Sequence, residues 1–438
     1  MKVTNWGNYP KIDTNFQGFS SIEELQNIVS TTDKLVARGL GRCYGDSALS
    51  QNIVSTLRHN RILAFNDITG QITCESGVSL AEVLEVCVPK GWFIPVTPGT
   101  KFVTVGGAVA SDVHGKNHHV EGSFSNHINS LDILLSNGNV VTCSKNLNSE
   151  LFWATCGGMG LTGIILQVTF GLKRIETAYI KQEIIKARNL EEIMEVFEAS
   201  ESFTYSVSWI DCLAQGKSQG RSIMMRAEHA KQTDLKPGTP PLQLPKKRKL
   251  AVPLDFPSFA LNSLSVKAFN FLYYHKAPGK LTESIIDYDT FFYPLDSIHQ
   301  WNRIYGKRGF TQYQFVLPKE NSRTGLKEIL NQISQSGQGS FLAVLKLFGK
   351  QNDLINFPKE GYTLALDFAI NDKVFPLLDE LDKVVLANGG RLYLTKDVRM
   401  NADFFRKTYA NSEAFIKLKH TFDSSNKFQS LQSQRLHI

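Results

Sequence analysis

The sequence predicts a two-lobed α+β protein, with an N-terminal ligand-binding part and a C-terminal part built on an antiparallel sheet covered by helices. The chain of 438 residues is longer than a single hydrophobic core usually serves. Its first 175 residues alternate short strands, short helices and glycine-rich loops. Beyond them, longer strand patterns alternate with helix patterns, which is typical of a sheet packed on helices.

Helices in the N-terminal part, residues 1–175, are predicted from capping signals. Ser21 and Ser79 are each followed three residues later by a glutamate, the pattern that opens a helix. The first helix is expected to reach about residue 29, and the second to end at residue 88, before Pro89. The Asn137-Gly138 pair predicts a hairpin. A helical turn is expected at 150–155, and strands at 34–37, 62–64, 71–74, 131–135, 140–143 and 163–170.

Glycine is concentrated in three segments of this part: 38–46 (RGLGRCYGD), 97–119 (TPGTKFVTVGGAVASDVHGKNHH) and 157–163 (GGMGLTG). Glycine lets the backbone approach a ligand closely, and clustered N–H groups bind anions. A single Gly-Gly pair is more often a tight turn between two strands, but three such segments indicate one extended ligand contacted from several sides. The GxGxxG spelling within 158–163 follows a helical turn and leads into a strand, the reverse of the order in a dinucleotide-binding βαβ unit.

Composition excludes several classes of function. The net charge is +7, and no basic face with interleaved aromatic residues is visible, so nucleic acid is not an expected partner. The six cysteines show neither CxxC nor metal-ligand spacing, which indicates reduced, buried thiols and no metal site. Neither a cleavable leader nor an apolar run of membrane-spanning length is visible. The expected location is the cytoplasm or the surface of a membrane, on either side of it.

The C-terminal part, expected at 176–395, contains one segment with an unusual composition. Residues 231–257 hold six of the fifteen prolines and the basic cluster 246–249, so no regular structure is expected there. The segment is either a solvated surface loop or a mobile lid attracted to anionic lipid head groups. Helices are predicted at 191–198, 322–336 and 373–388, and strands at 205–211, 222–227, 309–317, 339–348, 362–370 and 390–395.

The chain resembles flavoenzymes of the vanillyl-alcohol-oxidase type, which have a PCMH-type FAD-binding domain. The resemblance rests on the glycine-rich segments and on the later blocks LFWATCGGMGLTGI, FFYPLD, QYQFVLP, LKLFG and LYLTKD. Within that group the blocks are similar to the family of oxidases that act on decaprenylphosphoryl-β-D-ribose, from about residue 36 to the C-terminus. HGKNHH is the most specific block. The resemblance implies an FAD-binding domain at 1–175, a substrate domain at 176–395, and a segment at 396–438 that returns to the FAD-binding domain.

The resemblance also implies which residues hold FAD. Many relatives attach the flavin covalently to a histidine in the first glycine-rich loop, but this chain has Arg42 there, so we expect dissociable FAD. The expected FAD contacts are Arg38, Gly39, Gly41, Arg42, Cys43, Tyr44, Gly45, Pro98, Gly99, Thr100, Val105, Gly106, Gly107, Ala110, Ser111, His114, Gly115, Asn117, His118, Gly160, Gly163, Ile164 and Tyr393.

The implied chemistry is oxidation of a secondary alcohol, in which hydride passes to flavin N5 and a base takes the hydroxyl proton. The candidate base is His114, Lys396 or Tyr44, and the sequence leaves the choice open. Their alternative roles are structural, with Lys396 paired to Asp397 at the surface. Substrate contacts are expected from Trp209 and Phe348 as apolar walls, from Gln312 and Gln314 on one strand face, from Lys346 toward a lipid phosphate, and from Lys396.

The family's substrate is a lipid-linked pentose. The resemblance therefore implies oxidation of a polyprenyl-phosphoryl ribose at its 2′-hydroxyl, with a separate NADH-dependent short-chain reductase completing epimerisation to the arabinose form, a precursor of cell-wall arabinan. Two departures lie in the substrate part, where Ala365 replaces a cysteine and Phe292 replaces a tyrosine. The alternatives are an oxidase of sugar alcohols or aldonolactones, such as D-arabinono-1,4-lactone, and a flavin-binding scaffold without turnover.

Overall fold

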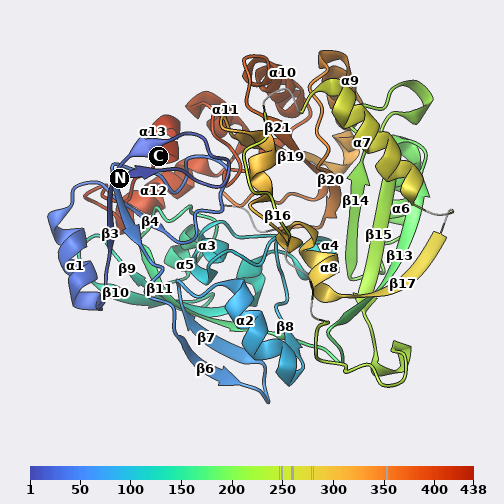
Figure 1. Cartoon of the computed structure of the whole chain (residues 1–438). Coiled ribbons are helices and arrows are strands. Elements are labelled where there is room, and N and C mark those ends of the chain that lie inside the picture. The colour runs from blue at the N-terminus through green and yellow to red at the C-terminus, as the bar shows by residue number, and fades with distance from the viewer. Residues whose placement is uncertain (246, 248–249, 258–260, 278, 280, 352–353) are drawn as a thin grey trace.

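The computed structural model describes residues 1–245, 247, 250–257, 261–277, 279, 281–351 and 354–438. It contains helices and sheets along the whole chain, so the predicted α+β class is confirmed (Figure 1). Within 231–257, the described residues form a short 3₁₀ turn, Gln232–Asp234, and one two-residue strand, and are otherwise irregular, as predicted. Lys246, Arg248 and Lys249 of the predicted basic cluster lie outside the described residues.

The N-terminal part of the chain contributes a five-stranded antiparallel sheet and a three-stranded parallel sheet. The predicted Asn137-Gly138 hairpin is confirmed, because Val140 pairs with Leu134 across it. The five strands, in sheet order, are β10 (Val140–Cys143), β9 (Ile128–Leu134), β11 (Ile164–Gly171), β7 (Gln71–Glu75) and β6 (Ile62–Asn66), and the three are β3 (Asn15–Gly18), β5 (Asn52–Ser55) and β4 (Val36–Arg38). Two-stranded pairs join β1 (Lys2–Val3) to β2 (Ile12–Asp13), β8 (Trp92–Phe93) to β12 (Lys173–Arg174) and β16 (Leu250–Ala251) to β18 (Ile298–His299).

The C-terminal part is organised around an antiparallel sheet, as the sequence predicts, and in the described part of the chain this sheet has eight strands. Two of its strands, β13 and β17, were not predicted, because their apolar residues do not alternate cleanly with polar ones. The strand expected at 390–395 ends at Leu392, since the N–H of Lys396 turns back to the carbonyl of Tyr393 at 2.9 Å. In sheet order the strands are β17 (Leu281–Asp287), β13 (Tyr179–Ala187), β15 (Ser222–His229), β14 (Tyr205–Ile210), β20 (Ala343–Phe348), β21 (Gly361–Ala369), β19 (Phe310–Pro318) and β22 (Arg391–Leu392).

Helix capping follows the sequence closely at α1 and α2. Ser21 and Ser79 cap these helices, and the Ser79 N–H also donates to the Glu82 carboxylate at 2.7 Å, which completes a capping box. The helices are α1 (Ile22–Thr31), α2 (Leu80–Cys87), α3 (Val105–Ala110), α4 (His118–Glu121), α5 (Ser149–Thr155), α6 (Leu190–Glu198), α7 (Ser263–Lys276), α8 (Tyr288–Phe292), α9 (Lys319–Ser336), α10 (Val374–Ala387), α11 (Ala402–Thr408), α12 (Ser412–Phe422) and α13 (Leu431–Leu436).

The Gly-Gly pair, expected in a loop, instead forms the first turn of α3. Thr104 caps this helix by accepting a hydrogen bond from the Gly107 N–H at 3.2 Å. A Cβ on Gly106 would lie 2.8 Å from the Ser76 side chain. The glycines therefore let α3 pack directly against the end of β7.

Two large hydrophobic cores support the sheets. One lies between the eight-stranded sheet and helices α6, α9 and α10. The other joins the five-stranded sheet to α2, α3 and α5. The opposite face of the eight-stranded sheet is thereby left to form a wall of the site described below.

The last residues of the chain lie beside β4, near the N-terminus (Figure 1). The Leu35 N–H donates to the carbonyl of Lys427, and the Gln429 N–H donates to the carbonyl of Leu35, both at 2.9 Å. The predicted domain boundaries remain predictions. No helix in the described part of the chain combines the length and apolar character needed to cross a bilayer.

Candidate active site

A cavity of about 590 Å³ is lined by all three glycine-rich segments and by one face of the eight-stranded sheet. Its size and mixed lining are typical of a ligand site. The structure thus brings together most of the predicted residues, from the first glycine-rich loop to the turn after β22. Those on the cavity wall are Arg38, Gly39, Gly41, Arg42, Cys43, Tyr44, Pro98, Gly99, Thr100, Gly106, Gly107, Ala110, Ser111, His114, Gly160, Gly163, Trp209, Gln312, Gln314, Lys346, Tyr393 and Lys396.

A second group of predicted contacts does not line this cavity, and their role in binding stays a prediction. Ile164 faces a hydrophobic core, whereas its neighbour Ile165 lines the cavity, because adjacent strand residues face opposite sides. Phe348 packs its ring on His114, 4.7 Å between centroids. The other residues of this group, held by backbone contacts or core packing, are Gly45, Val105, Gly115, Asn117 and His118.

The first glycine-rich loop offers unpaired backbone N–H groups to the cavity. Within the described part of the chain, nothing accepts a hydrogen bond from the N–H groups of residues 39–43, and the same holds for Gly99 and Thr100. A Cβ added at Gly99 or Gly160 would meet nothing within 4 Å, so these glycines border open space. Consecutive free N–H groups form a nest that suits an anion.

The second glycine-rich segment offers fewer free backbone N–H groups to a ligand than the sequence suggests. The Gly106 N–H donates to the Ser76 carbonyl at 2.9 Å, and the Gly107 N–H is taken by Thr104. These two glycines therefore contribute close packing and shape rather than donors. The Arg38 guanidinium is also occupied, since it donates to carbonyls of Thr4 and Ala48 at 2.7 and 3.2 Å.

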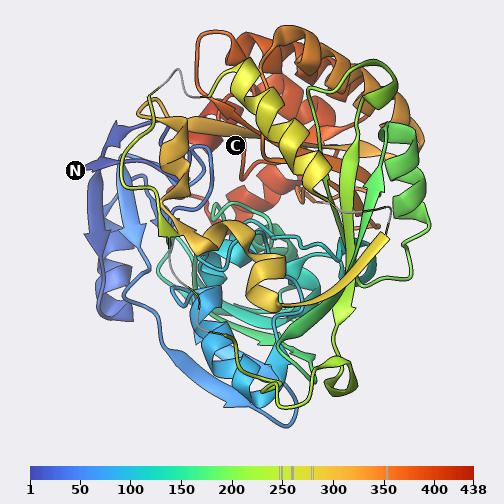
Figure 2. The same cartoon turned by 45° about the vertical axis from the view of Figure 1, so that its right-hand side comes forward.

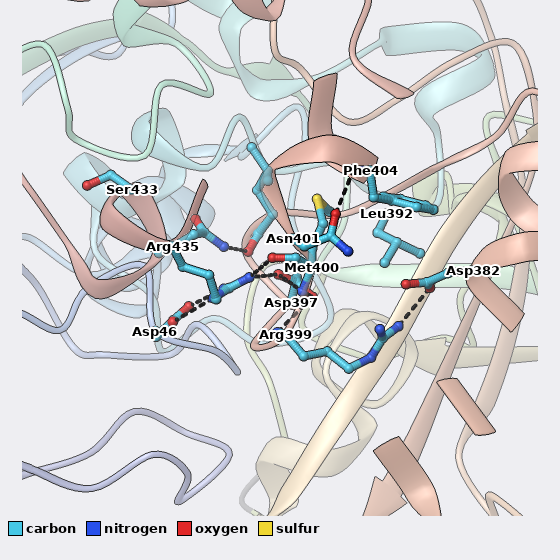
Figure 3. Close-up of polar contacts among 12 residues, drawn as sticks. Asp46, Asp382, Leu392, Asp397, Arg399, Met400, Asn401, Phe404, Ser433 and Arg435 are labelled. Atoms are coloured by element: carbon cyan, nitrogen blue, oxygen red, sulfur yellow. Dashed lines mark hydrogen bonds and ion pairs between the residues drawn. The ribbon is translucent and has the colours of Figure 1, made fainter. Parts of the chain in front are cut away.

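The first glycine-rich loop is hydrogen-bonded to, and packs closely against, the turn that carries Lys396. The Tyr44 N–H donates to the carbonyl of Thr395 at 3.1 Å. A Cβ on Gly45 would lie 1.7 Å from the Asp397 carbonyl oxygen, so only glycine fits. Arg435 of α13 bridges the Asp46 and Asp397 carboxylates at 2.8 and 3.0 Å (Figure 3). Asp397 is therefore paired with Arg435 and not with Lys396.

Lys396 lies on the cavity wall without a hydrogen-bonded carboxylate partner among the described residues. Its Nζ is 3.9 Å from the centroid of the Tyr44 ring, in cation–π geometry. Burial lowers the pKa of Lys396, partly offset by the charge of nearby Asp367. Burial likewise raises the pKa of Tyr44 well above its ordinary value, so the phenol stays protonated.

Gln312 and Gln314 share the cavity face of β19, as their alternation predicts. The Gln312 amide donates to Asp367 at 2.6 Å, and the Gln314 amide donates to Nε2 of His114 at 3.1 Å. Burial holds the pKa of His114 well below its ordinary value, so the imidazole is neutral. Asp367, on the neighbouring β21, was not predicted, because a carboxylate within an apolar strand gives no signal of its role.

Lys116 lies within the HGKNHH block, but the sequence gives no signal of its role. Lys116 and Lys346 both line the cavity. Burial lowers the pKa of Lys116 to about 7 and that of Lys346 to about 8. No carboxylate among the described residues offsets this effect at either lysine. Lys116 instead donates to the Phe291 carbonyl and lies 4.1 Å from the centroid of that ring.

Comparison with known proteins identifies the family. Residues 19–144 match the FAD binding domain family. The chain is also 38% identical to decaprenylphosphoryl-β-D-ribose oxidase of Mycolicibacterium smegmatis over 412 residues, which cover 92% of this chain and 89% of the relative. The chain belongs to this oxidase family. It is an FAD-dependent oxidoreductase, as its sequence predicts.

Two other relatives match different shares of this chain. An uncharacterised protein from Streptomyces coelicolor is 30% identical over 82% of this chain and 100% of its own length. D-arabinono-1,4-lactone oxidase of Yarrowia lipolytica is 29% identical, but over only 39% of this chain and 34% of its own length. The likeness to lactone oxidases is therefore partial.

The residues present fit FAD. The nest of free N–H groups at 39–43 suits a pyrophosphate, and Gly99 and Gly160 border open space that a cofactor can fill. Tyr393 stacks on Phe357 with 4.5 Å between centroids, and its hydroxyl donates to the Ser111 carbonyl at 2.8 Å. The wall near the His114 loop is thus rigid and aromatic, as packing against a flat ring requires.

Proposed function

We propose that this oxidase converts the 2′-hydroxyl of a polyprenyl-phosphoryl-β-D-ribose to the 2′-keto sugar. The observation that carries the proposal is the pair Lys116 and Lys346, two cavity lysines whose charge no described carboxylate balances. A substrate phosphate would supply the missing negative charge. The amides of Gln312 and Gln314, on the same sheet face, suit sugar hydroxyls. The named M. smegmatis relative, which matches most of the chain, supports the same substrate class.

The proposed mechanism assigns proton transfer to Lys396. Bound FAD supplies the hydride acceptor, flavin N5. Because burial lowers its pKa, Lys396 has a neutral fraction that can accept the hydroxyl proton at Nζ. The ammonium so formed lies over the Tyr44 ring and near Asp367, which stabilise it. His114 suits this role less, since its Nε2 already accepts a hydrogen bond from Gln314.

The keto product defines the next reaction. It must be reduced from the other face to give the arabinose form, which we assign to a separate NADH-dependent short-chain reductase. An aldonolactone oxidase is the alternative, and the partial match to such enzymes supports only the shared flavin chemistry. An uncharged lactone would leave Lys116 and Lys346 without a partner.

The proposal includes non-covalent FAD. Arg42 occupies the position of the usual linking histidine, and its guanidinium lies 4.0 Å from the centroid of the Trp6 ring. Acid precipitation of the purified enzyme should release all of the flavin into the supernatant. A yellow protein pellet would contradict this part of the proposal.

Anaerobic flavin bleaching tests the function. The holoenzyme should be bleached by prenyl-phosphoryl ribose, and much more slowly by free ribose or an aldonolactone. In the Lys116→Gln/Lys346→Gln variant the preference for the phosphorylated substrate should shrink by about 100-fold, because each charge-assisted contact contributes about 1.5 kcal/mol. Equal bleaching by lactone and prenyl-phosphoryl ribose in the wild type would refute the proposed substrate.

A further inference from the structure

Helix α7, Ser263–Lys276, carries its large apolar side chains on the outside. Leu264, Phe271 and Leu272 expose 77%, 53% and 67% of their surface. A helix that packs only within its own protein shows the reverse distribution. In Figure 2 this yellow helix crosses the front of the molecule, where its outer face is open.

The inner face of α7 is fixed by specific contacts, so its orientation is built into the fold. Asn270 is fully buried, and its amide donates to the Asp211 carboxylate at 2.8 Å. The Tyr274 hydroxyl donates to the Ala187 carbonyl at 3.2 Å, and Val266, one turn before Asn270, is also buried. A buried polar anchor with an apolar outer face presents a patch of the kind that marks an interaction surface.

Charge on this helix favours one kind of partner. Residues 261–281 contain no aspartate or glutamate, while Lys267 and Lys276 are exposed at the surface. Apolar side chains flanked by lysines are typical of helices that lie in the interface of anionic membranes. Pairing with a second copy of the same face would instead bring like charges together.

The helix is continuous with the cavity. Tyr273 lines the cavity and packs on Trp209, another cavity residue, with 4.8 Å between ring centroids. Phe269, on the exposed side, stacks on Tyr273 at 5.7 Å. An aromatic row therefore connects the outer face of α7 with the interior of the site.

We propose that α7 is a membrane-docking helix, which places Leu264, Phe271 and Leu272 at the acyl boundary of an anionic bilayer and Lys267 and Lys276 at its head groups. Docking by α7 brings the cavity mouth at Tyr273 to the lipid surface. The inference does not depend on which sugar is oxidised, because membrane binding is measured without substrate.

Vesicle co-sedimentation of the holoenzyme tests this. Wild type should sediment with phosphatidylglycerol-containing vesicles at low salt, and less with pure phosphatidylcholine or at high salt. The variant Leu264→Gln/Phe271→Gln/Leu272→Gln should lose at least about tenfold in vesicle partitioning. The control Ile68→Gln removes an apolar side chain that is 87% exposed in the turn between β6 and β7, and should bind as wild type.

Three results would overturn the proposal. The first is wild-type protein that fails to sediment with anionic vesicles, and the second is a triple variant that sediments equally well. The third is a wild-type dimer that the triple variant converts to monomer in light scattering without any vesicle binding, which would make the face an interface between copies. Flavin bleaching by a short-chain, water-soluble phosphoryl ribose should be unchanged in the triple variant, so failure of docking and failure of the proposed function are distinguishable.

Discussion

Replacing Arg435 with methionine should destabilise the flavin site from outside the cavity. Arg435 is 23% exposed, and it is held between two buried carboxylates, Asp46 at 7% and Asp397 at 4% side-chain exposure. Asp46 is the last residue of the first glycine-rich segment, and Asp397 directly follows Lys396 in the sequence. The Arg435→Met change therefore leaves two unpaired negative charges at the junction of both segments.

The expected loss is about 3 kcal/mol in the free energy of unfolding. Removing one partner of a buried ion pair costs about 3–5 kcal/mol, because the remaining charge is left uncompensated. The lower end of this range applies, since the Arg435 side chain is partly exposed to water. The Asp46→Asn change added to Arg435→Met should recover part of the loss, because it removes one of the stranded charges.

Urea titration of the holoenzyme, followed by flavin release, measures this effect. The matched control is Arg188→Met, which breaks an arginine–glutamate pair of 2.8 Å in which Arg188 is 81% exposed. That variant should lose at most about 1 kcal/mol. Equal stability losses in the two variants would refute the reasoning, as would an Arg435→Met protein that releases flavin at the wild-type urea concentration.

Three further predictions concern the cavity. Lys396→Met should slow flavin reduction at least about 100-fold with unchanged FAD content. Lys396→Arg should reduce flavin as slowly, because arginine stays charged and cannot accept the proton. Stopped-flow reduction measures both variants, and rapid reduction in either would contradict the proton-acceptor role. The KM for a phosphorylated sugar should rise as pH increases from 7 to 9, because Lys116 and Lys346 lose their protons with pKa values of about 7 and 8, whereas the KM for an uncharged sugar should show no such rise. Gly45→Ala should abolish FAD retention, since its Cβ would lie 1.7 Å from a carbonyl oxygen, while Gly18→Ala, with its nearest contact at 3.9 Å, should retain FAD; a yellow Gly45→Ala protein would show that the loop can move.

The sequence predicted those features that depend on local pattern. Capping residues located α1 and α2, and strand alternation placed Gln312 and Gln314 on one face. The helix α3 was missed, because its glycines have low intrinsic helix preference and only Thr104 and the contact with Ser76 stabilise it.

Residues that act through long-range contacts could not be found in the same way. Lys116 has no local feature that separates a cavity lysine from a surface lysine. Asp367 and Arg435 acquire their roles from partners far away in the sequence, respectively Gln312 and the pair Asp46 and Asp397. Lys346 was expected to join the two glutamines from another strand of the sheet, and in the structure its strand, β20, is separated from β19 by β21.

The close approach of Gly45 to Asp397 has a consequence for biosynthesis. The nest at residues 39–43 emerges early from the ribosome, but Tyr393 and Lys396, which also line the cavity, are translated much later, and Arg435 later still. A nascent chain that ends before residue 393 therefore lacks the part of the cavity wall that Tyr393 and Lys396 supply. Cofactor loading must be a late event in the making of this enzyme, and ribosome-bound chains stalled before that residue should stay colourless.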